Sequence, residues 1–138
     1  MMSKTQDIRW VQRYQNFSKA CKLLSEIDAY KAEETPAIIK EGFIHRFEIV
    51  FDLLWKTARD YLEHEGISVQ PTPRAVIKEA FAAGIISNGQ VCIEMLEARN
   101  LMAHKYDEET FGTVFLRIQG QFYPAIEELR AFLEGKQA

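Results

Sequence analysis

Residues 36–66 read PAIIKEGFIHRFEIVFDLLWKTARDYLEHEG, and this stretch decides the fold class. Its apolar side chains recur at steps of three and four, which is the spacing of one face of a helix. Thr35 and Pro36 have the composition of a helix start, and Gly66 that of a helix end. The stretch therefore predicts one long amphipathic helix. Its apolar face comprises Ile39, Phe43, Phe47, Val50, Leu54 and Tyr61, widened by Phe51 and Trp55.

The same spacing occurs on both sides of this stretch. The earlier apolar face comprises Trp10, Tyr14, Phe17, Cys21, Leu24 and Ile27. The later one comprises Phe111, Phe115, Ile118, Phe122, Ile126, Leu129 and Leu133. Both patterns predict long helices that bury one side.

Turn and cap residues divide the rest of the chain. A short helix is predicted over about residues 73–83, between Thr72-Pro73 and Gly84, and the next opens at Asn88-Gly89. Asp107, followed by two glutamates, caps the last helix. No alternating apolar-polar stretch is bounded by turn residues, so no strand is predicted. We therefore expect an all-α, antiparallel four-helix bundle with one additional short helix, in a single domain over residues 1–138.

Composition limits the function. Of 138 residues 47% are hydrophobic, which is enough for a large core and excludes intrinsic disorder. The formal net charge of −3 argues against coating DNA or a membrane surface, so we expect neither as a partner. No apolar run approaches the roughly 18 residues of a membrane span. The first ten residues lack the apolar stretch of a secretory signal, so we expect a cytoplasmic protein.

Motifs for metals and cofactors are absent from the sequence. Cys21 and Cys92 are too far apart for a zinc knuckle, and we expect both in the core because each stands among apolar helix-forming residues. The sequence contains no Cys-x-x-Cys-His, no glycine-rich phosphate loop and no His-x-x-x-His. We therefore expect no metal and no cofactor. His45 belongs to a polar stripe with Glu41, Glu48, Asp52, Lys56 and Arg59, which we interpret as a solvated helix face with spacing-four ion pairs.

Residues 97–107, EARNLMAHKYD, concentrate reactive side chains just before the last helix. Asn100 and His104 share a helix face, whereas Arg99 and His104 point about 140° apart on an unbroken helix. The pair converges only if the helix ends around it or if a symmetry-related chain supplies one member. Arginine, asparagine and histidine together suit metal-free cleavage of a phosphodiester. The alternative is structural, in which Arg99 pairs with Glu97 or Asp107 and His104 only caps.

Two motifs extend this pattern over nearly the whole chain. The first runs through Arg46-Phe47-Glu48-x-x-Phe51-Asp52-Leu53-Leu54-Trp55-Lys56-Thr57. The second is Met95-Leu96-Glu97-x-Arg99-Asn100-Leu101, continued by His104, Tyr106, Asp107 and Glu108. Together they resemble the nucleotidyltransferase substrate-binding protein family, a branch of the HEPN superfamily. The chain departs from the family pattern at Met102-Ala103, where relatives often carry small hydroxyl residues.

The resemblance implies a homodimeric four-helix bundle whose R-x-x-x-x-H segments line a cleft. It implies a minimal nucleotidyltransferase, encoded nearby, as the partner in a toxin–antitoxin pair. Arg99, Asn100 and His104 would then be catalytic residues of a metal-independent endoribonuclease. Tyr106 would be the hydroxyl that the partner modifies with AMP. The phenylalanine-rich helix faces also favour a dimer, because they exceed what one bundle core readily covers.

Two functions stay open at this point. In the first, the chain is an endoribonuclease toxin that binds RNA. In the second, it is a non-catalytic substrate-binding or regulatory subunit of the nucleotidyltransferase. The net negative charge favours the second, because RNA affinity rests on neutralising phosphates. The intact R-N-x-x-x-H-x-Y pattern favours the first.

Overall fold

The computed structural model describes residues 4–137, and no strand occurs among them. The α-helices are α1 (Lys4–Ser25), α2 (Ala37–His64), α3 (Pro73–Ala82), α4 (Gly89–His104), α5 (Glu108–Arg117) and α6 (Tyr123–Glu134). Two 3₁₀ turns, Glu26–Ala29 and Ala32–Glu34, connect α1 to α2. A π-helical turn, Ile118–Phe122, makes α5 and α6 one continuous helix. The predicted all-α class, with four long helices and one short helix, is confirmed.

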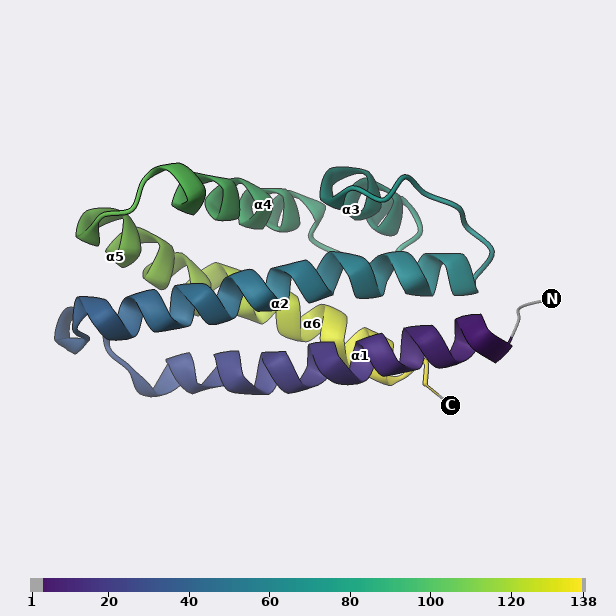
Figure 1. Ribbon diagram of the computed structural model, residues 1–138, viewed down its shortest axis with the longest axis horizontal. Coiled ribbons are helices and arrows are strands. Elements are labelled where there is room, and N and C mark those ends of the chain that lie inside the picture. Colours follow the sequence, from purple (N-terminus) through teal and green to yellow (C-terminus); the bar gives the residue numbers. More distant parts are fainter. Residues whose placement is uncertain (1–3, 138) are drawn as a thin grey trace.

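The bundle is elongated and α2 forms its centre (Figure 1). α1 runs antiparallel along one side of α2, while α3 and α4 lie along the other side. The continuous helix of α5 and α6 crosses behind, with α5 against α2 and α6 against α1. This arrangement brings the C-terminal end of α4 beside the N-terminal half of α2.

The three predicted apolar faces form one core. Every residue named for the first and third faces is buried. The second is buried apart from Ile39 and Trp55, which are half-buried against the core. Phe47 of α2 stacks on Phe122 with ring centroids 5.3 Å apart, which joins the central helix to the last one. Cys21 and Cys92 are both buried, as expected.

The phenylalanines are covered within the one chain. Seven are buried and Phe132 is half-buried against the core, whereas Phe81 on α3 is 55% exposed. The prediction that phenylalanine-rich faces need a second chain to cover them is therefore wrong. The reason is that the continuous helix over residues 108–134 lies across α2. Its own phenylalanine-rich face and that of α2 therefore bury each other.

Three predicted helix starts are confirmed by side-chain caps. Thr72, Asn88 and Asp107 each accept a hydrogen bond from the backbone N–H three residues later. The cap expected at Thr35 is wrong. Its hydroxyl instead donates to the carbonyl of Lys31 at 2.6 Å, and α2 begins one residue later than expected because Pro36 is extended.

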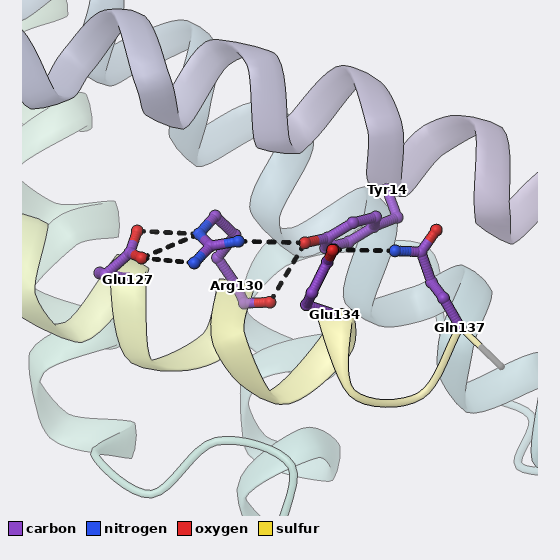
Figure 2. A network of polar contacts seen from close by, with 5 residues as sticks. All are labelled: Tyr14, Glu127, Arg130, Glu134 and Gln137. Atoms are coloured by element: carbon purple, nitrogen blue, oxygen red, sulfur yellow. Dashed lines mark hydrogen bonds and ion pairs between the residues drawn. The ribbon is translucent and has the colours of Figure 1, made fainter.

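Polar contacts attach the last helix to the first (Figure 2). Arg130 forms a bidentate ion pair with Glu127, and its guanidinium also donates to the Tyr14 hydroxyl of α1 at 3.3 Å. That hydroxyl in turn donates to the Arg130 carbonyl at 3.4 Å. Glu134 accepts a hydrogen bond from Gln137 at the same end of α6. The network fixes α6 against α1 on the side away from α4.

Residues 4–137 also limit what the fold can hold. None of the helices there is both long and apolar enough to cross a membrane. The same residues contain no group of three or more His, Cys, Asp or Glu side chains that could hold a metal ion.

Candidate functional site

Helix α4 carries the reactive segment to its end. The helix continues without a break through His104, and the Lys105 N–H still donates to the Leu101 carbonyl at 2.8 Å. The chain turns within residues 105–107, and Asp107 then caps α5. Hydrogen bonds from the backbone N–H and the hydroxyl of Thr110 lower the pKa of Asp107 below its usual value.

Arg99 is half-buried between α4 and α2. Its guanidinium lies over the ring of Phe51, 5.5 Å from the centroid. Among the described residues it forms no ion pair with Glu97, Asp107 or any other carboxylate. The structural interpretation, in which Arg99 is held by a neighbouring acid, is therefore wrong.

Asn100 and His104 lie on the solvent side of α4. Both side chains are exposed, and four residues of helix place them on one face. Within residues 4–137 neither side chain takes part in a hydrogen bond, so His104 does not cap the helix. Because α4 is unbroken, Arg99 and His104 point about 140° apart and one chain does not bring them together.

Tyr106 projects from the turn after α4. Its side chain is 72% exposed, its ring meets the edge of Phe111 with centroids 4.7 Å apart, and its hydroxyl donates to Glu41 Oε2 at 2.5 Å. The alternative that it packs under the turn is therefore wrong. The hydrogen bond to the Glu41 carboxylate is the main cause that raises the pKa of Tyr106, and the charge of Glu48 adds to it.

A pocket of about 190 Å³ lies beside this hydroxyl. Its walls are Glu41, Ile44, His45, Glu48, Met102, Tyr106 and Phe111. Glu41 and His45 were not predicted as part of the site, because their spacing on α2 also fits a solvated face, and Glu48 was identified only as a polar residue of the family motif. The sequence places these side chains on one face of a helix. It does not show which element lies opposite that face, and that element makes the face part of a pocket.

The departure from the family pattern falls partly inside the core. Met102 is buried and forms a wall of the pocket, whereas Ala103 is exposed. Of these two positions, only 103 therefore faces solvent near His104. The apolar side chain of Met102 contributes packing between α4 and α2.

Arg99 and Tyr106 meet α2 at different levels. Arg99 lies over Phe51 and Tyr106 bonds to Glu41, ten positions earlier on the helix. At about 1.5 Å per residue, these two contacts are about 15 Å apart along α2. A phosphate carried on the Tyr106 hydroxyl therefore does not reach Arg99 of the same chain without a change of conformation.

Known proteins are similar to this chain in both sequence and fold. Residues 12–135 match the family described as nucleotidyltransferase substrate binding protein like. A crystal structure of a protein from Thermus thermophilus is 27% identical, with a TM-score of 0.70 over 88% of this chain and 98% of that one.

A curated relative is similar over a shorter segment. The probable ribonuclease HepT of Haemophilus influenzae is 25% identical over 91 residues, 60% of this chain and 62% of that protein. The match thus spans less than two thirds of that relative. The family match covers nearly all of the described chain, and the fold is the helical bundle that the HEPN resemblance implied. The chain belongs to the nucleotidyltransferase substrate binding protein like family, within the HEPN superfamily.

Proposed function

We propose that this protein is the toxin of a two-protein system and a metal-independent endoribonuclease, whose partner is a minimal nucleotidyltransferase encoded nearby. One observation carries the proposal. Among the half-buried arginines, residues 13, 46, 59, 117 and 130 each pair with a carboxylate, whereas Arg99 has no acidic partner among the described residues. An unpaired guanidinium, on the helix that also carries exposed Asn100 and His104, is available for a phosphate.

The chemistry follows from these groups. In RNA, the ribose 2′-hydroxyl attacks the adjacent phosphorus, its proton passes to solvent water, and the 5′-oxygen leaves. His104 donates the proton that this oxygen needs, Arg99 stabilises the charge on the phosphoryl oxygens, and Asn100 binds one of them. The products are a 2′,3′-cyclic phosphate and a free 5′-hydroxyl, and the reaction needs no metal.

A homodimer supplies the convergence that one chain lacks. Because Arg99 and His104 lie on different sides of α4, the site takes its arginine from one protomer and its histidine from the other. The cleft between two copies of the end of α4 then binds single-stranded RNA. We expect residues 1–138 to act as one domain in the cytoplasm.

Tyr106 is the proposed point of control. Tyr106 is exposed in the turn that directly follows His104, so the nucleotidyltransferase can transfer AMP to its hydroxyl. The added phosphate and nucleoside cover the approach to His104 and repel RNA phosphates. Modification at Tyr106 would neutralise the toxin without separating the helices.

The second candidate is a non-catalytic substrate-binding or regulatory subunit. The observation that favours it is electrostatic, because the net charge is −3 and two carboxylates line the pocket beside Tyr106. Such a surface binds RNA weakly. In this case Tyr106 is still presented to the nucleotidyltransferase, but Arg99 and His104 cleave nothing.

RNA cleavage in EDTA distinguishes the two candidates. Purified wild-type protein should cleave single-stranded RNA and leave a cyclic phosphate. His104→Ala and Arg99→Ala should each lower the rate by about 10²–10⁴-fold, the range for loss of one acid–base or charge-stabilising group. Arg74→Ala, at an exposed position on α3, is the matched control and should retain full activity. Equal cleavage by all four proteins indicates a contaminating nuclease, and the subunit function then takes precedence.

A further inference from the structure

The hydrogen bond between Tyr106 and Glu41 joins two distant parts of the chain. The residues are 65 positions apart, and the bond of 2.5 Å is at the short end of the range for a hydroxyl and a carboxylate. Ile44, Met102 and Phe111 provide apolar walls around it. The tyrosine itself is exposed, so the hydroxyl is held by Glu41 and is accessible from outside at the same time.

A tyrosine that receives AMP must lose its proton. The phenol is protonated at neutral pH, and the carboxylate of Glu41 raises the pKa of Tyr106 further by bonding to its neutral form. Little preformed tyrosinate is therefore present at neutral pH. The proton has to leave as the new bond forms, and this requires a base in contact with the hydroxyl.

We propose that Glu41 is the general base for nucleotidyl transfer to Tyr106, an inference that rests on the proposed role of Tyr106 as AMP acceptor. The co-reactant is a nucleoside triphosphate, ATP, presented by the nucleotidyltransferase. Tyr106 Oη forms a bond to the α-phosphorus, and its proton passes to Glu41 Oε2. The bond from the α-phosphorus to the bridging oxygen breaks, and pyrophosphate leaves with the electron pair. Glu41 then releases the proton to solvent.

The neighbouring groups are less suited to this step. His45 and Glu48 line the pocket, but within residues 4–137 the Tyr106 hydroxyl makes its hydrogen bond to Glu41 alone. Asp107 is engaged by the backbone and side chain of Thr110. The toxin would thus contribute one catalytic residue to its own modification.

The first experiment measures transfer of labelled AMP from ATP and Mg²⁺ by the nucleotidyltransferase encoded beside this chain. Glu41→Gln preserves a side-chain acceptor for the hydroxyl but not a base, and should slow the transfer by about 10²-fold or more. Glu41→Asp, with its carboxylate drawn back by one methylene, should give an intermediate rate. Glu65→Gln is the matched control, because Glu65 accepts a hydrogen bond of 2.6 Å from Tyr61 at the other end of α2. It should react at the wild-type rate.

The pH dependence adds a second readout. In the pocket beside the hydroxyl the titratable groups are Glu41, His45 and Glu48 of α2, and α5 contributes the apolar ring of Phe111. Lys105 and Asp107 are the charged neighbours of Tyr106 along the chain. Without the base, transfer depends on the small fraction of tyrosinate, which grows about tenfold per pH unit below the phenol pKa. The ratio of wild-type to Glu41→Gln rates should therefore fall as pH rises from 7 to 9.

A third readout does not involve the nucleotidyltransferase. Ultraviolet difference titration of Tyr106, with Tyr106→Phe as the blank, should show a lower phenol pKa in Glu41→Gln than in wild type. Equal transfer rates in wild type and Glu41→Gln, or an unchanged Tyr106 titration, overturn the role of Glu41 as general base. These outcomes leave the acceptor role of Tyr106 intact. Wild type that receives no AMP from an active nucleotidyltransferase overturns the acceptor role of Tyr106 and this inference with it.

Discussion

Mixing two inactive variants, Arg99→Ala and His104→Ala, should restore ribonuclease activity. Both side chains project from the unbroken helix α4, five positions apart. On a helical cylinder about 11 Å wide, tips about 140° apart around the axis and about 7.5 Å apart along it are about 13 Å from each other. Two groups that contact one phosphate must lie within about 8 Å, two hydrogen bonds of about 2.9 Å plus the width of the phosphate. In the proposed homodimer, a working pair would therefore take one member from each chain.

The expected recovery follows from the statistics of a two-fold dimer. Random association of equal amounts of the two variants gives about half heterodimers. Each heterodimer has one intact pair of Arg99 and His104 and one site that lacks both, so it retains about half of the wild-type activity. An unfractionated mixture should thus reach about a quarter of the wild-type activity and heterodimers purified away from the homodimers about half, whereas each variant alone should be lower by about 10²–10⁴-fold.

The assay co-expresses the two variants with different affinity tags and purifies through both. Native mass spectrometry establishes that heterodimers have formed, and cleavage of single-stranded RNA is measured in EDTA. Pairing each variant with the double variant Arg99→Ala/His104→Ala is the control, because no intact pair can then form. Heterodimers that cleave no faster than the separate variants, beside an active wild type, refute the reasoning that the site is shared between chains.

Three further outcomes are expected. Tyr106→Phe should receive no AMP in intact-mass spectra after co-expression with the nucleotidyltransferase. In the proposed toxin role this variant should also escape neutralisation. An adduct on this variant contradicts the assignment of Tyr106 as the AMP acceptor. Burial raises the pKa of the Cys21 and Cys92 thiols to about 12, so neither should react with a thiol reagent before unfolding. As pH rises, the thiols ionise in the unfolded state before they ionise in the folded state. The free energy of unfolding should therefore be unaffected by the thiols below pH 8.5 and should fall above it, by up to about 1.4 kcal/mol per pH unit for each thiol. Urea unfolding at several pH values measures this change. Gly66→Ala should lower the free energy of unfolding by about 1–2 kcal/mol, because a side chain is strained at the φ of +83° that Gly66 adopts, although the space around it is open. Gly120→Ala in the π-helical turn is the control and should not destabilise the fold.

Local patterns were sufficient to predict the helices. Three of four predicted caps, at Thr72, Asn88 and Asp107, depend on one side chain and a backbone N–H three residues away. Such interactions are encoded within one turn of chain. The cap at Thr35 failed because a competing local acceptor, the carbonyl of Lys31, captured its hydroxyl.

Contacts between distant segments were harder to predict. The apolar pattern of the last helix indicated one continuous element, but it did not indicate the π-helical turn near Gly120. The side chain of Gln119 in this turn donates to the carbonyls of Ile27 and Tyr30, about 90 positions earlier. This contact depends on how the last helix lies across the end of α1. A single helix pattern carries no information about that crossing.

The polar stripe of α2 shows why a helix face cannot be assigned a role without the element opposite it. Its C-terminal part behaves as interpreted, with spacing-four ion pairs from Asp52 to Lys56 and from Arg59 to Glu63. Its N-terminal part does not, because α2 has 28 residues and α4 only 16. The difference is about 18 Å of helix. Where α4 ends, a three-residue turn lies over α2 instead of a helix, and it leaves a pocket in which Tyr106 meets Glu41. The same periodic spacing is thus a solvated face at one end and the wall of a candidate site at the other, and the length of the opposing helix decides which.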